Sequence, residues 1–146
     1  MPHFDHSEIL PFPRDLLYKI VTDVNLYPEF LPWCLSANIL EKGESDLLAD
    51  LQVGLGPFKE TFRSHVKLTP PSRVEVIYKE GSLKHLNTFW ILQEISPHET
   101  HIDFHVDFVF QSRIFNKMIE SFFEQAAHKM INAFKKRAEF LMKSHV

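Results

Sequence analysis

Apolar and polar residues alternate along the middle of the chain. In residues 102–110 an apolar side chain occupies every even position, and Asp103, His105 and Asp107 lie between them. A period of two places alternate side chains on opposite faces of a β-strand. The same alternation recurs in four further segments, at residues 47–55, 58–68, 73–79 and 86–92. These segments predict an antiparallel sheet that is covered on one face, with meander turns at 69–72 and 96–99.

On both sides of this region the apolar residues follow the spacing of a helix. Residues 11–24 predict a helix entered through Pro13, because the apolar residues at 16, 17, 20, 21 and 24 share one helical face. A second short helix is expected to end near Pro32. Residues 112–143 carry a wide apolar face and predict a single C-terminal helix about 45 Å long.

The order of elements predicts an α+β fold in one domain, residues 1–146. Residues 3–9 predict a first strand, and a further strand is expected at 36–43. The two short helices lie between these strands. A curved antiparallel sheet wrapped around the long C-terminal helix is the compact arrangement of these elements. The chain shows no repeat, linker or low-complexity tract that would mark a domain boundary.

Composition narrows the class of protein. Apolar residues make up 45% of the chain, and 14 phenylalanines against four glycines indicate a largely aromatic interior. No stretch approaches the roughly 20 apolar residues of a membrane span, and no secretory signal is evident. One cysteine cannot form an internal disulfide, which favours a reducing, cytoplasmic setting. A formal net charge of −3 argues against general binding to nucleic acid, and DNA is not expected as a partner.

The segment at residues 23–34, DVNLYPEFLPWC, places aromatic side chains on a stretch broken by two prolines. Two interpretations are open for Tyr27, Phe30, Leu31 and Trp33. They form either a plug that closes one end of the core or a gate at the entrance of a cavity. A gate requires Trp33 to be partly exposed.

Polar residues on the apolar faces are the candidate contacts for a ligand. Glu60 shares its face with Phe62 and Val66, and as a neutral acid it could donate a hydrogen bond to a ligand carbonyl. The alternative is that Glu60 lies near the strand end and reaches water. Ser64 is a second, weaker candidate of the same kind, and Glu60, Tyr78 and Tyr27 are the only candidate acids or bases for a pocket.

No metal site or catalytic motif is expected. His101, Asp103 and His105 share a strand face, but steps of about 7 Å do not suit tetrahedral zinc, and a solvated face is favoured. Cys34 is expected to be a packed thiol. Five basic residues of the last helix form either a solvated face or a contact with membrane headgroups or ribosomal RNA: Lys129, Lys135, Lys136, Arg137 and Lys143.

Five segments carry a family resemblance: YPEFLPWC at 27–34, ETFRSHV at 60–66, LNTFW at 86–90, IDFHVDFVFQS at 102–112 and MINAFKKRA at 130–138. In sequence and order they resemble the coenzyme Q-binding, START-like family of the polyketide cyclase superfamily. Bacterial members of that family are often labelled ribosome association toxin, or RatA-like. The chain departs from the family at 81–83, where it has GSL in place of Gly-Pro-Phe.

The resemblance implies a helix-grip fold with a hydrophobic cavity that binds ubiquinone or a related polyisoprenoid lipid, without catalysis and with no required cofactor. It leaves two alternatives, a RatA-type inhibitor that binds the large ribosomal subunit and a polyketide cyclase-like enzyme. A cytoplasmic protein with peripheral contact at the inner membrane fits the first function. The expected ligand-binding residues are Tyr27, Phe30, Leu31, Trp33, Glu60, Phe62, Ser64, Tyr78, Trp90, Phe104, Phe108, Phe115, Met118 and Phe122.

Overall fold

The computed structural model describes residues 3–31, 33–55, 58–81, 83–121 and 123–144. One antiparallel sheet contains every strand of this described chain, in the order β1-β7-β6-β5-β4-β3-β2. The predicted strands are confirmed. Their bounds are β1 (His3–Leu10), β2 (Cys34–Lys42), β3 (Asp46–Leu55), β4 (Phe58–Thr69), β5 (Arg73–Gly81), β6 (Leu83–Ser96) and β7 (Glu99–Phe110).

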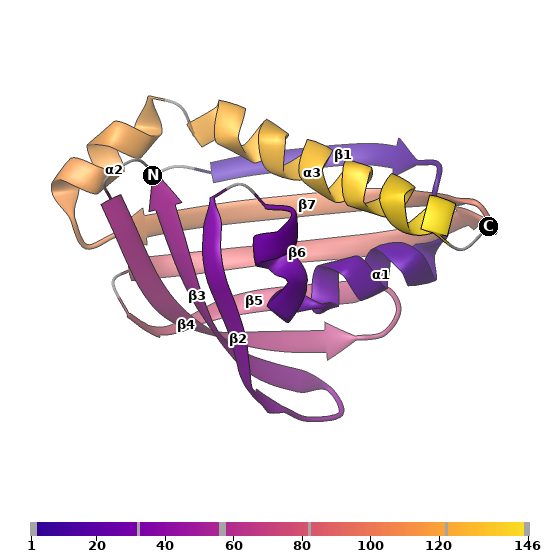
Figure 1. The fold of residues 1–146 in the computed structure, drawn as a ribbon, viewed down its shortest axis with the longest axis horizontal. Coiled ribbons are helices and arrows are strands. Elements are labelled where there is room, and N and C mark those ends of the chain that lie inside the picture. Colours follow the sequence, from indigo (N-terminus) through magenta and orange to yellow (C-terminus); the bar gives the residue numbers. More distant parts are fainter. Residues whose placement is uncertain (1–2, 32, 56–57, 82, 122, 145–146) are drawn as a thin grey trace.

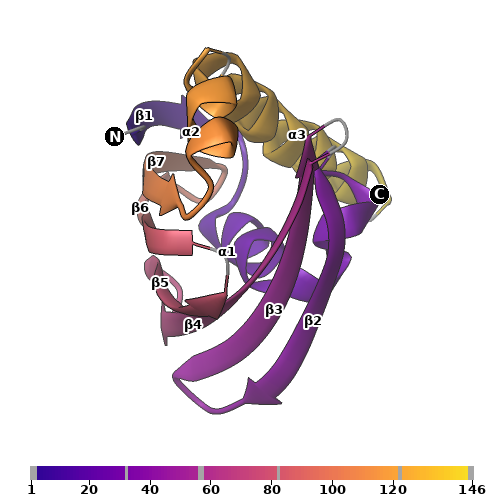
Figure 2. The same ribbon diagram turned by 90° about the vertical axis from the view of Figure 1, so that its left-hand side faces the viewer.

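The sheet curves strongly around the helices. Figure 2 shows β1 and β7 on one side of the C-terminal helix and β2 and β3 rising on the other side. Irregularities in strand pairing occur twice in β2, and again between Arg63 and Ser64 of β4. Irregularities of this kind bend a strand and increase its twist, which brings the two edges of the sheet toward the same helix.

Two short helices follow β1, as predicted. Helix α1 (Arg14–Thr22) begins directly after Pro13, whose extended backbone precedes the first turn, and it buries Leu17, Ile20 and Val21. The 3-10 helix η1 (Val24–Glu29) contains Pro28, which suits a short, tight helix better than a long one. The Asn25 side chain accepts a hydrogen bond of 2.8 Å from the backbone N–H of Ile39, so η1 is attached to the edge strand β2.

The prediction of one continuous C-terminal helix is wrong. Helix α2 (Arg113–Glu120) and helix α3 (Phe123–Ser144) are separate and run in different directions (Figure 1). At the end of α2 the Ser121 hydroxyl donates to the carbonyl of Met118 at 2.7 Å. Such a bond competes with continued helix formation. The 22 residues of α3 give a length of about 33 Å.

The core lies between the concave face of the sheet and the helices. Trp90 packs against Phe104 and Phe134, with ring centroids 4.4 and 5.0 Å apart. These three residues connect β6, β7 and α3 near the middle of the molecule. A smaller cluster lies toward α2, where Leu83, Phe108, Phe110 and Ile119 are buried. Figure 1 shows α3 crossing the sheet above this interior.

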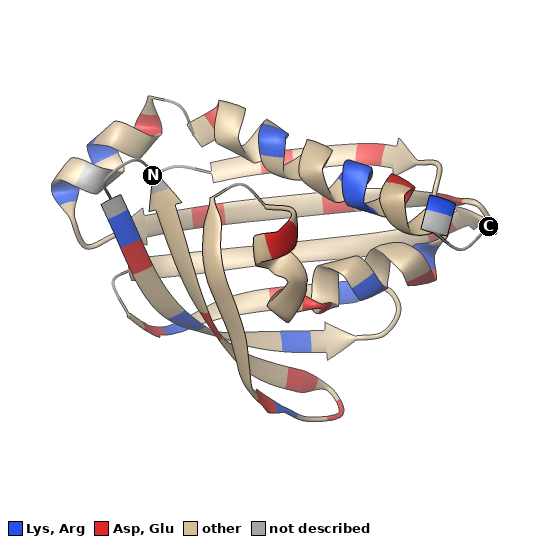
Figure 3. Ribbon diagram, in the orientation of Figure 1, with Lys and Arg blue, Asp and Glu red and all other residues tan. Residues whose placement is uncertain are grey.

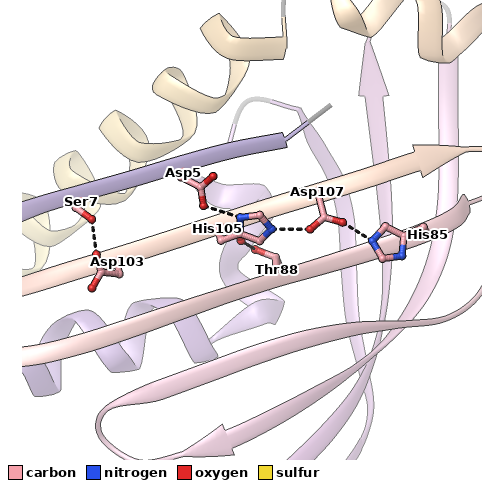
Figure 4. A network of polar contacts seen from close by, with 7 residues as sticks. All are labelled: Asp5, Ser7, His85, Thr88, Asp103, His105 and Asp107. Atoms are coloured by element: carbon pink, nitrogen blue, oxygen red, sulfur yellow. Dashed lines mark hydrogen bonds and ion pairs between the residues drawn. The ribbon is translucent and has the colours of Figure 1, made fainter. Parts of the chain in front are cut away.

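A polar network covers part of the outer face of the sheet (Figure 4). His105 Nδ1 lies 2.6 Å from Asp5, and His105 Nε2 lies 2.5 Å from Asp107, which also contacts His85. Burial alone would lower the pKa of His105, but the hydrogen bonds with Asp107 and Asp5 outweigh it and raise that pKa. No group of metal-ligating side chains occurs among the described residues. These contacts between histidine and aspartate side chains connect β1, β7 and β6.

Candidate functional site: an apolar cavity beneath two helices

A cavity of about 160 Å³ lies between the sheet and the two C-terminal helices. Its walls come from the segment before β2, from four strands and from both helices. The lining residues are Trp33, Val53, Phe62, Leu83, Leu86, Val106, Phe108, Phe110, Ile119, Phe123, Ala126, Ala127 and Met130.

Small residues at the start of α3 leave this space open. Ala127, Ile131 and Phe134 share one helical face, because residues four and seven positions apart lie above one another. Phe134 fills the interior with an aromatic ring that packs on Trp90. Nearly two turns earlier, Ala127 projects only a methyl group toward the sheet. The cavity therefore lies at the α2 end of the interior, where the helix face is small.

The cavity wall is almost entirely apolar. Among the described lining residues, no side chain carries an acid, a base or a hydroxyl, and the indole N–H of Trp33 is the single polar side-chain group. Trp33, Val53 and Phe62 are half-buried, so this part of the wall is partly accessible to solvent. A wall of this composition can bind an apolar group, but for the oxygen atoms of a polar one it offers a single donor, the indole N–H of Trp33.

Three of the predicted ligand-binding residues line the cavity: Trp33, Phe62 and Phe108. The others from the 23–34 segment lie elsewhere. Tyr27 and Phe30 pack edge-on against Phe134, at 5.8 and 5.2 Å between ring centroids. Leu31 is 3% exposed and belongs to the main core.

Tyr27 is held in place as a structural residue. Its hydroxyl donates to the backbone carbonyl of Val21, and burial raises the pKa of the phenol. Burial also raises the pKa of the Cys34 thiol to about 11. A thiol with that pKa is protonated at neutral pH and is a poor nucleophile, as expected for a packed cysteine.

Trp90 and Phe104 belong to the main core, where they pack on each other, and they do not line the cavity. Met118 packs against the smaller cluster near α2. The side chain of Phe115 and the whole of Phe122 lie outside the described residues.

The three polar candidates do not line the cavity. Glu60 is half-buried in β4, opposite Val53 of β3. Ser64 is fully buried, between Ala49 of β3 and Tyr78 of β5, and its hydroxyl has no hydrogen-bond partner within the described structure. Ser64 is thus one of three described residues with a buried, unsatisfied polar atom, together with Arg14 and Tyr18, and it lies two residues along the same face from Phe62.

Ten lining residues are absent from the predicted set: Val53, Leu83, Leu86, Val106, Phe110, Ile119, Phe123, Ala126, Ala127 and Met130. Most of them lie on the apolar faces that the periodicity identifies. The signal for the cavity itself is the adjacent pair Ala126 and Ala127, which places two small side chains together at the start of α3.

Comparison with known proteins places these features in a family. The family model described as polyketide cyclase / dehydrase and lipid transport matches residues 10–135. The ribosome association toxin RatA of Pseudomonas aeruginosa is 32% identical over 139 residues, which cover 95% of this chain and 96% of that protein. The mitochondrial coenzyme Q-binding protein COQ10 homolog B of Xenopus laevis is 31% identical, over 92% of this chain and 57% of that protein.

Solved structures share the fold. An 18 kDa protein of Caulobacter crescentus has a TM-score of 0.79 and 28% identity, covering 98% of this chain and 99% of its own. The Zhui aromatase/cyclase of a Streptomyces species has a TM-score of 0.81, 21% identity, and coverage of 94% and 93%. At that identity the likeness to the aromatase/cyclase shows the fold alone. Within the described part of the chain, no helix has both the length and the apolarity to span a bilayer.

Proposed function

Because the chain belongs to the polyketide cyclase / dehydrase and lipid transport family, we propose that it binds the apolar part of an isoprenoid lipid such as ubiquinone, without catalysis. The observation that carries this proposal is the apolar cavity of about 160 Å³ between the sheet and α2 and α3. In this function the protein lies on the cytoplasmic side of the inner membrane and takes the lipid out of that membrane.

The volume of the cavity decides which part of the ligand enters it. A dry apolar cavity of about 150 Å³ takes up a benzene molecule. The space therefore suits an isoprene unit or a ring rather than a complete long-tailed quinone. Each buried CH₂ is worth about 0.8 kcal/mol, so a five-carbon isoprene unit contributes about 4 kcal/mol. A neutral hydrogen bond contributes about 1 kcal/mol. The tail therefore sets affinity, and the rest of the ligand extends past Trp33 and Phe62 toward solvent.

Filling the cavity tests this function. Ala126 lines the cavity, whereas Ala133 is equally half-buried on the same helix but does not line it. We expect Ala126→Leu to lower affinity for ubiquinone about tenfold or more. The leucine side chain fills space in which more than one CH₂ group of the ligand would otherwise be buried. Ala133→Leu serves as the matched control, with little change expected. Quenching of tryptophan fluorescence by the quinone, measured with Trp90→Phe in the background so that only Trp33 reports, provides the measurement.

Mass spectrometry of lipid extracted from the purified protein identifies the native ligand. An isoprenoid recovered from the unmodified chain and lost from Ala126→Leu supports the proposal. Equal binding of ubiquinone by both alanine variants, with both folded, contradicts it.

A second candidate function is association with the large ribosomal subunit. It is supported by the relative from Pseudomonas aeruginosa named as a ribosome association toxin. That function would use the exterior of the molecule, so Ala126→Leu should leave it unchanged. Sedimentation with purified large subunits, in the presence and absence of ubiquinone, separates the two functions. A cyclase-like enzyme is not proposed, because the cavity wall offers no acid or base.

A further inference from the structure

Strand register shows which exposed residues surround the cavity at its α2 end. Leu83 of β6 pairs with Phe110 of β7, and Gly81 of β5 pairs with Phe62 of β4. Strands β4 and β6 therefore begin where β5 and β7 end, directly before α2. The start of β2 lies at the same end, because Cys34 pairs with Val53 near the end of β3. We call this surface the cavity end (Figure 1).

The cavity end exposes large aliphatic side chains. Ile114 of α2 is 71% exposed, and Leu35 at the start of β2 is 46% exposed and lies over Gly54. Trp33, directly before β2, is half-buried and lines the cavity. The acyl boundary of a bilayer favours exposed aliphatic side chains of this kind when basic residues lie beside them.

Basic residues accompany these aliphatic side chains. Arg113 and Lys117 are exposed on α2 beside Ile114, and Lys59 and Lys84 are exposed at the starts of β4 and β6. Figure 3 shows the basic positions of α2 at this end of the molecule. Within the described residues, none of these four cations forms an ion pair. They remain available to an anionic partner.

Glu120, the acidic residue of α2, does not neutralise the basic residues around Ile114. Glu120 lies at the other end of the helix and lines a surface groove with His6 of β1 and His128 of α3. Two of the five basic residues of the last helix, for which a solvated face or a headgroup contact is open, form ion pairs within the protein. Lys135 pairs with Glu8 at 2.8 Å, and Arg137 pairs with Glu29 at 3.4 Å.

The inner side of α2 is fixed over the cavity. Ile119 lines the cavity, and the Asn116 amide both donates to the Phe110 carbonyl, at 2.6 Å, and accepts from the Phe110 N–H, at 2.8 Å. This double hydrogen bond attaches α2 to the end of β7 and directs Ile114 away from the protein. A helix that covers a cavity on one side and presents an aliphatic residue between two cations on the other fits a lipid surface.

We propose that the cavity end docks on the surface of an anionic lipid bilayer. Ile114 and Leu35 enter the acyl boundary, and Arg113, Lys117, Lys59 and Lys84 contact the phosphate headgroups. Ribosomal RNA is less well matched, because exposed aliphatic groups have no favourable place on a phosphate backbone. Docking would place the cavity opening at the membrane, which serves the proposed lipid binding, but docking itself requires no ligand in the cavity.

Vesicle flotation tests the proposal, with the ligand-free chain and two vesicle compositions. One is phosphatidylcholine alone, and the other is an equal mixture of phosphatidylcholine and phosphatidylglycerol. Each basic residue near an anionic surface is worth about fivefold in affinity. We expect Arg113→Gln/Lys117→Gln to weaken binding to the mixed vesicles about tenfold or more. Ile114→Asp should do so about tenfold by loss of insertion, and high salt should weaken binding of the unmodified chain.

Matched controls lie at the other end of the molecule. Ile95, 50% exposed near the end of β6, controls for Ile114 when changed to Asp. Lys136→Gln/Lys143→Gln, on the later part of α3, controls for the loss of two charges. Circular dichroism melting verifies that each variant is folded, and the cation pair tests the proposal independently if Ile114→Asp does not fold.

Three results would overturn the docking proposal. One is unchanged vesicle binding by both cavity-end variants, and another is an equal loss in the far-end controls. The third is loss of binding to ribosomal RNA with vesicle binding unaffected. Since these assays contain no quinone, failure of docking leaves the cavity proposal standing, and failure of quinone binding leaves docking standing.

Discussion

At the scale of single residues, the most informative side chain is Ser64. It is fully buried on the inner face of β4, and its hydroxyl has no partner in the described structure. Burying a hydroxyl without a hydrogen bond costs about 1–3 kcal/mol. Ser64 therefore destabilises the unliganded protein.

We expect Ser64→Ala to raise the free energy of unfolding by about 1 kcal/mol, because the unsatisfied hydroxyl is removed. Urea denaturation of the ligand-free protein measures this change. Thr100→Val is the matched control, since Thr100 is equally buried but its hydroxyl donates to the Phe12 carbonyl at 2.8 Å. That control should lower the stability by a similar amount. A Ser64→Ala protein that is less stable than the unmodified chain would show that the hydroxyl has a structural partner.

At the scale of elements, the aromatic segment after α1 divides into two parts. Tyr27 and Phe30 pack on Phe134 and close the interior, as in the plug interpretation. Trp33 is half-buried and forms part of the cavity wall, which meets the condition set by the gate interpretation. The packing of Tyr27 and Phe30 agrees with the plug interpretation, and the gate interpretation stays a prediction for Trp33 alone.

Trp33→Ala should cost less than the 3–5 kcal/mol typical of truncating a buried tryptophan, about 1–2 kcal/mol. It should also speed the transfer of bound quinone to vesicles, because one wall of the cavity opening is removed. Unfolding free energy and transfer rate are measured on the same variant. Phe30→Ala provides the comparison, with loss of stability but no faster transfer expected. If Trp33→Ala loses much stability but its transfer rate is unchanged, the gate interpretation is wrong and only the plug interpretation remains.

At the scale of the whole molecule, charge on the outer face connects the edge strand β1 to the centre of the sheet. Burial would raise the pKa of Asp107, but the hydrogen bonds with His105 and His85 lower it. The contribution of Asp107 to the stability of the fold is fully present above the pKa that this carboxyl has in the unfolded chain, near 3.8. It is lost as the pH falls through the lower pKa of the folded protein. The pKa of His105 is raised in the folded protein. Its contribution to stability is therefore fully present below pH 6.5, the pKa of the unfolded chain, and is lost as the pH rises through the pKa of the folded protein.

The network therefore stabilises the fold most between about pH 4 and pH 6.5. We expect His105→Gln to lower the free energy of unfolding by about 1 kcal/mol at pH 6 and by clearly less at pH 8.5. Urea denaturation at the two pH values measures the difference. His98→Gln, in the exposed turn between β6 and β7, is the control. A loss that is equal at both pH values would mean that the charge of His105 does not contribute.

The sequence alone determines the elements and their faces. A period of two is a local property, so the strands, their covered face and the antiparallel order follow from the alternation before any contact is known. The interruption after Glu120 does not follow from periodicity, because the apolar spacing continues through it. Where α2 ends, the Ser121 hydroxyl donates to the Met118 carbonyl, a contact that the apolar spacing does not reveal.

Only the tertiary structure decides where the interior is filled and where it is open. Phe104 and Phe108 share one strand face, four residues apart, and nothing in the local pattern distinguishes them. Phe104 packs beside Trp90 in the dense core, whereas Phe108 lines the cavity along with Ala127. A cavity is a volume left by several elements at one point, so its position depends on which side chains of α3 meet which strand, and that pairing is non-local.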